Sequence, residues 1–330
     1  MKIVAVALSI VVGLGILAAI LYYVGWQEIV LEILALGWPG FAVLAGDFLL
    51  TFFFWALTWR IILRSYGINS PWWALLRALF SGFAVSYLTP SMYFGGEPIR
   101  VYILSKEIGI SQPRLYATVL VTKLLEALSL VLFVLLGVFY ALFAEQLPPI
   151  QRESLFYGTI FLGFWVLLGV LNFTLNLYLG TRLIRGLGRL LPWKRALEKV
   201  KEVEGEIHQA FHGPKLLSTA LALFTSFIAN LLIYLRPQIF FYFSEERIFS
   251  FSDLSLLYAL SVVLASLFWI TPGGIGIAEG GRIGIFALVG IGEAGAVAFS
   301  FKAVELIFVL LGISLLMQFG LLRWRRRMKE

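Results

Sequence analysis

Six stretches of more than 20 residues are predominantly apolar and end in charged or turn-forming residues. A helix needs about 20 apolar residues to cross the hydrocarbon core of a bilayer, so each stretch is long enough for a membrane span. The first follows Lys2 and has no small-residue cleavage site after it, which predicts a retained helix rather than a signal peptide. The predicted spans are residues 3–24, 41–63, 114–143, 154–178, 215–243 and 293–321.

Two further apolar segments, about 70–108 and 254–290, are interrupted by proline and glycine. Proline ends a helix in each segment, and the neighbouring glycines permit a tight backbone turn. Broken backbone at membrane depth is tolerated only where protein buries it or where it lines a wet cavity. We therefore predict two re-entrant helical hairpins. Their hinge residues are Pro90, Gly95 and Gly96 in the first and Pro272, Gly273 and Gly274 in the second.

The interrupted segments carry one motif twice. The first copy is TPSMYFGGEPIR at 89–100 and the second is TPGGIGIAEGGR at 271–282, with threonine, proline, glutamate and arginine at equal spacing. A Lys-x-x-Glu pair then follows each copy inside the next span. This second pair lowers the chance of an accidental repeat about a hundredfold. The repeated charged residues are Glu97, Arg100, Lys123 and Glu126 in the first half and Glu279, Arg282, Lys302 and Glu305 in the second.

The composition of the whole chain is that of a membrane protein. Hydrophobic residues make up 60% and charged residues 14% of its 330 positions, and the mean hydropathy is +0.92. A soluble domain of this length does not need so apolar a chain for its core. Cysteine is absent, which excludes disulfide and thiolate chemistry. We predict an all-α polytopic membrane protein with six full spans and two re-entrant hairpins.

Lysine and arginine are distributed unevenly around these spans. If the N-terminus is cytoplasmic, 20 of the 26 basic residues lie in cytoplasmic segments, three lie outside and three lie within spans. This bias follows the positive-inside rule and predicts a cell-membrane protein with both termini in the cytoplasm. Anionic lipid then accounts for the net charge of +7, so nucleic acid is not expected as a partner.

With this topology the two hairpins enter the membrane from opposite sides. We predict two inverted-topology repeats, residues 1–150 and 151–330, each made of two spans, a hairpin and a further span. Transporters built in this way place their site near the midplane, between discontinuous helices. The hydrophilic segment 180–213 is predicted to be amphipathic and to lie on the cytoplasmic surface, and it is too short for a separate catalytic domain.

The eight repeated charges carry the candidate chemistry. One charge at the bilayer centre costs about 2.5–3.5 kcal/mol on insertion scales, so these residues must pair or face water. One cavity lined by both sets would satisfy all of them. Its arginines and lysines would hold an anionic head group, above all a phosphate, while its glutamates balance the charge of the empty site or carry protons. The alternative is a set of ion pairs that only holds the hairpins in register, although apolar side chains do that no worse.

Other polar residues give weaker signals. Asp47, Arg60 and Arg236 are further charges of the spans and are expected at the cavity or at its rim. His208 and His212 are four residues apart without a third ligand nearby, which favours a solvated pair over a metal site. No nucleotide-binding, hydrolase or metalloprotease motif is present, so neither a cofactor nor catalytic residues are expected.

The two motifs resemble those of a known family. Thr-Pro with a following Gly-Gly-Glu-Pro-Ile-Arg, and later Thr-Pro-Gly-Gly-Ile-Gly-Ile-Ala-Glu-Gly, are similar to the flippase-like membrane domain of the lysylphosphatidylglycerol synthase family, the N-terminal part of the bacterial multiple peptide resistance factor. The similarity covers essentially the whole chain. It implies movement of aminoacylated phospholipid across the cytoplasmic membrane, with site residues Glu97, Arg100, Glu279 and Arg282. Some relatives are fused to glycosyltransferases acting on lipid-linked sugars. The chain ends after its basic tail without an aminoacyl-transferase domain, so synthesis of lysyl lipid is not expected.

Together these observations predict a flippase or scramblase, not driven by ATP and not an enzyme, for an anionic phospholipid or a polyprenyl-linked lipid. Its expected partners are membrane lipids, including lipid-linked sugar, and a homo-oligomer is compatible with the sequence. Two alternatives stay open. An ion-coupled carrier for a small soluble anion would take up solute without moving lipid. A non-catalytic membrane partner of a separate lipid-modifying enzyme would be needed for that enzyme's activity.

Overall fold

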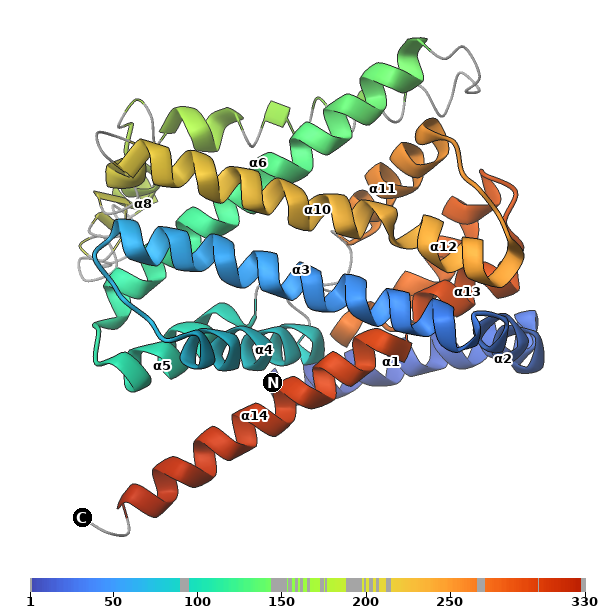
Figure 1. The fold of residues 1–330 in the computed structure, drawn as a ribbon, viewed down its shortest axis with the longest axis horizontal. Coiled ribbons are helices and arrows are strands. Elements are labelled where there is room, and N and C mark those ends of the chain that lie inside the picture. Colours follow the sequence, from blue (N-terminus) through green and yellow to red (C-terminus); the bar gives the residue numbers. More distant parts are fainter. Residues whose placement is uncertain are drawn as a thin grey trace.

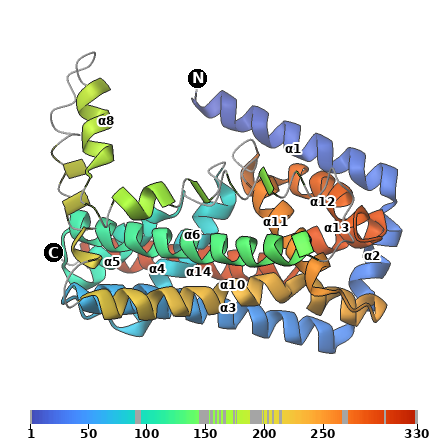
Figure 2. The same cartoon turned by 90° about the horizontal axis from the view of Figure 1, so that it is seen from above.

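The computed structural model describes residues 2–89, 95–143, 215–265, 271–301 and 303–327, together with residues 167–172, 177–187 and 208–211 and scattered single or paired residues between 153 and 205. These described residues form helices and connections, with no strand among them, as predicted for an all-α protein. The helices pack side by side in a bundle, and α1 (Lys2–Val24) and the end of α14 (Ala303–Arg327) project from it (Figure 1, Figure 2).

Four helical stretches of the described chain are long and apolar enough to cross a membrane. They correspond to four of the predicted spans. A fifth is possible where α1 and α2 (Trp26–Ala35) form a pair bent by 84° at Gly25, whose positive φ of 92° suits glycine. The predicted span 154–178 falls where the structure describes the chain only in part, so it is not tested. The four stretches are α3 (Gly37–Ser65), residues Gln112–Leu135 of α6 (Gln112–Phe143), α10 (Leu216–Glu245), and Glu293–Leu322, shared by α13 (Glu293–Phe301) and α14.

The central contact of the bundle joins α3 and α10. Thr58 Oγ1 lies 2.8 Å from Thr225 Oγ1, and further along the helices Asp47 is paired with Arg236. Both steps cover eleven residues, which is about three helical turns, so the same face of each helix stays in contact. Since the numbers fall along α3 as they rise along α10, the two helices are antiparallel.

Helix is broken at both motifs. In the first half, α4 (Trp72–Leu88) and α5 (Glu97–Ile108) pack on each other on either side of the motif. In the second half, α11 (Phe251–Ala265) and α12 (Ile277–Ala287) do the same, and the short 3₁₀ helix η2 (Pro272–Gly274) lies before α12. Entry of these two units from opposite sides of a membrane stays a prediction.

The predicted hinge residues fall at these breaks. Gly95 is in a turn and Gly96 immediately precedes α5, while Pro90 lies outside the described residues. Gly273 and Gly274 have positive φ angles of 63° and 70°, which L-residues with side chains rarely adopt. Pro272 begins the 3₁₀ helix beside them.

Each broken unit packs on a long helix of the other half. α4 lies against α14, and α11 lies against α6. The end of α4 also reaches η2, where a Cβ added at Gly273 would stand 3.1 Å from the Tyr87 ring. These contacts bring the surroundings of the first motif to those of the second.

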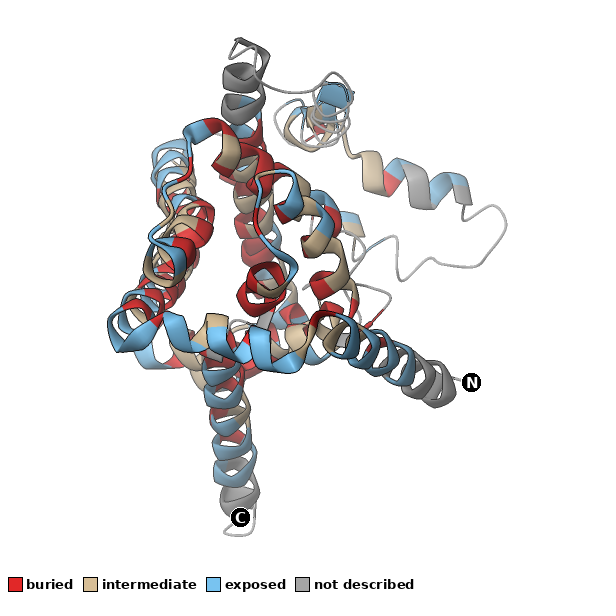
Figure 3. Ribbon diagram, turned by 90° about the vertical axis from the view of Figure 1, so that its right-hand side faces the viewer, coloured by how far each residue is buried: buried red, intermediate tan, exposed pale blue. Residues whose placement is uncertain are grey.

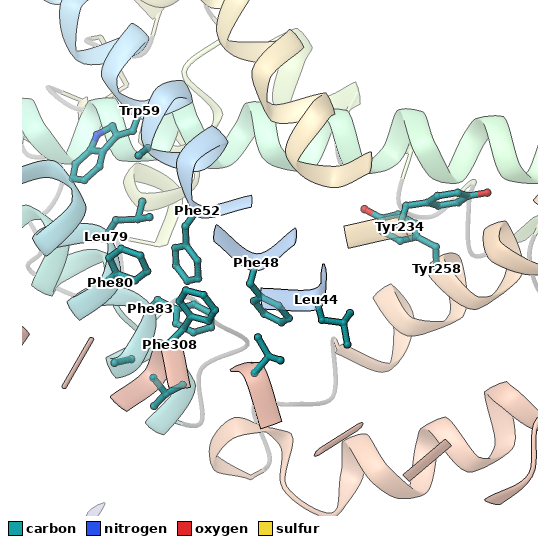
Figure 4. Close-up of a cluster of buried hydrophobic side chains, with 14 of the residues drawn as sticks. Leu44, Phe48, Phe52, Trp59, Leu79, Phe80, Phe83, Tyr234, Tyr258 and Phe308 are labelled. Carbon is teal, nitrogen blue, oxygen red and sulfur yellow. The ribbon is translucent and has the colours of Figure 1, made fainter. Parts of the chain in front are cut away.

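An aromatic cluster fixes α3, α4 and α14 together (Figure 4). The Phe52 ring centroid lies 4.4 Å from that of Phe80, 4.9 Å from that of Phe83 and 5.3 Å from that of Phe308. Phe52 is 1% exposed, so these rings form a buried aromatic core beside the helix contacts. A Cβ at Gly312 would overlap the Phe80 carbonyl oxygen, so glycine is what lets α14 approach α4 this closely.

The burial pattern is that of a chain with an apolar exterior. Buried residues gather between the helices, whereas residues 11–23 of α1 and the part of α14 up to residue 322 that projects are largely exposed (Figure 3). Leu310 and Met317 of α14 are 65% and 63% exposed despite being hydrophobic. Such residues on long apolar helices suit contact with lipid.

The hydrophilic segment 180–213 is described only in part. The buried Glu204 lies at the start of helix α8 (Leu179–Leu187). Its carboxylate accepts hydrogen bonds from the backbone N–H groups of Gly180 at 2.8 Å and Thr181 at 3.0 Å. His208 is buried, with its ring centroid 4.4 Å from that of Tyr178. The prediction of a solvated histidine pair is therefore wrong for His208, and His212 lies outside the described residues.

Candidate functional site

A cavity of about 390 Å³ lies between the two halves of the chain. Five of the eight repeated charged residues line it, and they come from both halves. Glu97 and Glu279 are buried next to it, and Lys302 lies outside the described residues. The structure thus brings the two sets together at one cavity. The lining charges from the motifs and their pairs are Arg100, Lys123, Glu126, Arg282 and Glu305.

In the first half, one lysine faces two carboxylates. Lys123 Nζ lies 2.8 Å from Glu126 Oε2, one helical turn along α6, and 3.7 Å from Glu97 Oε1 at the start of α5. Glu97 is 8% exposed, yet neither of its carboxylate oxygens has a hydrogen-bond partner among the described residues. Burying an anion without hydrogen bonds is costly, so the Glu97 carboxylate is held mainly by the lysine charge.

In the second half, the equivalent glutamate has a fixed partner. Glu279 Oε2 accepts the backbone N–H of Gly276 at 2.7 Å, three residues upstream, and so caps the first turn of α12. Tyr87, from the first half, lies close enough to Glu305, Glu279 and Arg282 for their charges to act on its hydroxyl. The two halves are therefore in electrostatic contact at this point.

The motif arginines have no counter-ion within the described chain. Arg100 is 7% and Arg282 8% exposed, and both line the cavity. The Nε of each lacks a hydrogen-bond partner, and neither guanidinium lies within 4.0 Å of a described carboxylate oxygen. A buried guanidinium without a partner is costly and attracts an anion that can take several N–H donors at once. The cavity is therefore suited to a phosphate or carboxylate.

A third arginine at the cavity is already paired. Arg236 lines the wall, with its Nε 2.7 Å from Asp47 Oδ2 and its guanidinium 3.8 Å from the Phe48 ring centroid. Asp47 is 4% exposed and is the partner of Arg236 across the α3–α10 contact. Arg60 is not among the lining residues and lies 4.1 Å from the Trp72 ring centroid. Of the three extra charges noted in the spans, one thus reaches the cavity itself.

A neutral polar network that the sequence did not predict lies on the same wall. Asn230 donates to the Glu126 carbonyl at 3.3 Å and to Ser129, and its side-chain oxygen accepts from the Tyr258 hydroxyl at 3.2 Å. Ser129 in turn lies 3.1 Å from Ser226. A signal for it was present, because small polar residues recur on one stretch of the apolar span 215–243. The network anchors the Lys123–Glu126 pair of α6 to α10.

Most of the other lining residues are apolar and many are aromatic, so the cavity lining combines charged groups with aromatic rings. This combination suits an amphiphile better than a small hydrated ion. No group of three or more His, Asp or Glu side chains able to hold a metal occurs among the described residues. The aromatic lining residues are Phe48, Phe52, Trp55, Phe83, Tyr234, Tyr258 and Phe299.

Curated relatives of the chain are archaeal membrane proteins. A UPF0104 membrane protein of Pyrococcus horikoshii is 26% identical over 308 residues, 88% of this chain and 89% of its own length. One of Methanothermobacter thermautotrophicus is 27% identical over 304 residues, 86% of each chain. One of Methanocaldococcus jannaschii is 26% identical over 140 residues, 42% of this chain and 41% of its own. No solved structure is a significant match.

The family of the chain follows from a match over nearly its full length. The model of the family described as "Lysylphosphatidylglycerol synthase TM region" matches residues 5–321. This match confirms the resemblance drawn from the two motifs, and it agrees with helices that are long and apolar enough to cross a membrane. The chain is therefore a multi-pass membrane protein that belongs to the lysylphosphatidylglycerol synthase TM region family.

Proposed function

We propose that the protein translocates a lipid with an anionic, phosphate-bearing head group across the cell membrane without ATP. The observation that carries this proposal is the pair of buried arginines, Arg100 and Arg282, that reach one cavity from the two halves without a counter-ion among the described residues. A phosphate would supply the acceptors that their guanidinium groups lack. Lys123, also on the wall, adds a third positive charge.

The rest of the wall supports a lipid substrate over a small soluble anion. A carrier for a hydrated anion needs polar groups around the whole ligand, whereas here rings such as Phe52, Phe83 and Phe299 form much of the lining. Acyl or prenyl chains gain free energy against such a surface, and the head group gains it against the charges. A membrane-embedded cavity of this kind suits anionic phospholipids and polyprenyl-linked lipids, including lipid-linked sugars.

We further propose that the chain is built from two inverted repeats, residues 1–150 and 151–330, with six spans, two re-entrant hairpins and cytoplasmic termini. The pairwise packing supports this arrangement. In this arrangement α3, α4 and α5 of the first half correspond to α10, α11 and α12 of the second, and α6 corresponds to α13 and α14. The contact of α4 with α14 then corresponds to the contact of α11 with α6. Likewise α4 on α5 corresponds to α11 on α12, and α5 on α6 to α12 on α13. Alternating exposure of a central site is typical of such repeats.

In this proposal the protein moves lipid and catalyses no covalent step. The carboxylates of Glu97 and Glu126 balance Lys123 while the cavity is empty, and an arriving phosphate competes with them for that cation. A separate lipid-modifying enzyme would supply the substrate and is the expected protein partner. Energy coupling then depends only on differences in lipid or proton concentration across the membrane.

A proteoliposome assay tests the proposal. Purified protein is reconstituted with a trace of fluorescent phosphatidylglycerol, and dithionite is added to quench the label in the outer leaflet. We expect the label in the inner leaflet to become accessible with the protein and to stay protected without it. Loss of either cavity arginine removes charge-assisted hydrogen bonds of about 1.5–3 kcal/mol, so Arg100→Gln and Arg282→Gln should slow transport about tenfold or more.

Arg60→Gln is the matched control, because Arg60 also lies on a long helix but does not line the cavity. It should transport at the wild-type rate. The same vesicles loaded with lipid-linked sugar instead of phosphatidylglycerol distinguish the two lipid classes. The proposal is wrong if both labelled lipids stay protected in the presence of folded protein while the vesicles take up radiolabelled inorganic phosphate. The substrate would then be a soluble anion instead of a lipid.

A further inference from the structure

Arg236 stands between the main cavity and a second, smaller one. The smaller cavity measures about 30 Å³ and is lined by apolar residues of α2, α3, α10, α13 and α14, among them Ile33, Leu44 and Phe240. Phe48, Arg236 and Phe299 line both cavities, so they form the partition between them. A ligand that moves from the main cavity toward the smaller one therefore passes Arg236.

The guanidinium is held in one orientation by its neighbours on α3. Nε donates to Asp47 Oδ2 at 2.7 Å, one terminal nitrogen donates to Thr51 Oγ1 at 2.9 Å, and the group lies 3.8 Å from the Phe48 ring centroid. Arg236 is 8% exposed. Ring contact and hydrogen bonds together keep the cation on the partition instead of letting it turn away from it.

This pair is a poor device for stability alone. A buried ion pair is often no more stable than apolar residues of the same volume, and Asp47 Oδ1 has no hydrogen-bond partner among the described residues. Elsewhere along the α3–α10 contact, a neutral hydrogen bond between Thr58 and Thr225 joins the two helices without any charge. The charges therefore need an explanation other than joining α3 to α10.

The backbone beside Arg236 allows the side chain to move. Pro237 lies inside α10 and has no N–H to donate to the Ile233 carbonyl, so the helix lacks one hydrogen bond there. Ile233 and Pro237 both line the main cavity. A helix bends most readily at such a site, which would shift Arg236 relative to Asp47 on the facing helix.

We propose that Arg236 is a second anion-binding station, held by Asp47 while the cavity is empty and transferred to the phosphate group as it moves away from Arg100 and Arg282. This inference rests on the proposed function and adds to it the direction in which the head group crosses the partition. Asp47 and the phosphate compete for one guanidinium, so the two interactions exclude each other.

Competition makes opposite predictions for the two members of the pair. Binding of short-chain dihexanoyl phosphatidylglycerol to the detergent-solubilised full chain is measured by calorimetry. We expect Arg236→Gln to weaken binding about tenfold and Asp47→Asn to tighten it severalfold, because the second variant frees the guanidinium. Arg236→Lys keeps a charge and should lie between wild type and Arg236→Gln.

The double variant Asp47→Asn with Arg236→Gln keeps the pair neutral and should bind as weakly as Arg236→Gln alone. Size-exclusion profiles and thermal unfolding identify variants that fail to fold, and Thr58→Val is the control for a change in the α3–α10 contact away from the cavity. Equal affinity in all folded variants, or weaker binding in Asp47→Asn, overturns the inference. If Arg100→Gln loses binding while Arg236→Gln binds like the wild type, the inference about Arg236 is wrong but the proposed function is not. If the wild-type protein does not bind the lipid, the proposed function itself is contradicted.

Discussion

The two copies of the motif contain the same glutamate and arginine, but their glutamates are in different situations. Glu279 accepts the Gly276 N–H and is fixed in the first turn of its own helix. Glu97 has no hydrogen bond among the described residues and faces Lys123 at 3.7 Å. Repetition in sequence therefore does not mean repetition in chemistry. We infer that the first copy holds the carboxylate that responds to a ligand.

The start of the helix explains this difference. α12 begins at Ile277, two residues before Glu279, so this side chain reaches back to the residue that precedes the helix. α5 begins at Glu97 itself, followed by Pro98. Proline disfavours the α conformation of the residue before it and is tolerated only in the first turn of a helix. Pro98 therefore prevents α5 from starting earlier in the chain. At the position of Pro98 the second copy has Gly280, which imposes no such limit.

The small residues around the motifs are also arranged differently. A Cβ at Gly96 would overlap the carbonyl oxygen of Gly82, so α4 and α5 touch through their backbones. The equivalent positions in the second half are Ala278 and Leu264, and there Leu264 packs instead on Gly281. At this pair of positions the first half has a contact between two backbones, which the second half replaces by a side-chain contact.

Exchanging the residues at this close contact should have the largest effect. Gly96→Ala places a methyl group on the Gly82 carbonyl, which cannot give way, and we expect a loss of about 3 kcal/mol or more in the free energy of unfolding. The reciprocal Ala278→Gly should cost only about 1 kcal/mol. Thermal unfolding in detergent, followed by circular dichroism, measures both. Equal losses would mean that the two motifs are packed alike.

Substitution of the two motif glutamates should affect the rate of lipid transport to different extents. Glu97→Gln removes the charge that faces Lys123, and we expect lipid transport to fall about tenfold with little change in thermal stability. Glu279→Gln keeps a side-chain oxygen that can accept the Gly276 N–H and should retain most of the rate. Glu279→Ala, which removes the cap, should lower the stability by about 1 kcal/mol. If the two glutamine variants lose activity equally, the proposed division between the copies is wrong.

The smallest expected effect concerns two serines of α4, only one of which is bonded to the first motif. Ser86 Oγ accepts the Gly96 N–H at 2.8 Å, whereas the buried Ser81 Oγ has no partner among the described residues. We expect Ser86→Ala to cost about 1 kcal/mol and Ser81→Ala to cost nothing or to stabilise slightly. Denaturant or thermal titration in detergent compares them. A loss of similar size in both would show that the serine hydrogen bond does not position Gly96.

Much of the helical layout was predictable from sequence, because a span depends on the hydropathy of neighbouring residues. The run 41–63 lies within α3, 114–143 lies within α6, and the break predicted around Pro90, Gly95 and Gly96 falls between the end of α4 at Leu88 and the start of α5 at Glu97. The breaks at the motifs were predictable for a similar reason, since proline and glycine act on the local backbone. Long-range pairing had no such local signal. Asp47 and Arg236 are 189 residues apart and were noted only as charges at the cavity or at its rim.

By itself the sequence determined that this protein is helical, lies in a membrane and carries one charged constellation twice, because apolar length, helix-breaking residues and repeated spacing are properties of the chain alone. Only the tertiary structure decided which charges are paired among the described residues, since that depends on which face of each helix its neighbours cover. Arg100 and Arg282 belong to the repeated motif and Arg236 does not, but nothing in their sequence surroundings says which of the three has a counter-ion. Asp47 of α3 pairs with Arg236, whereas no carboxylate of the described residues pairs with the two motif arginines at the cavity.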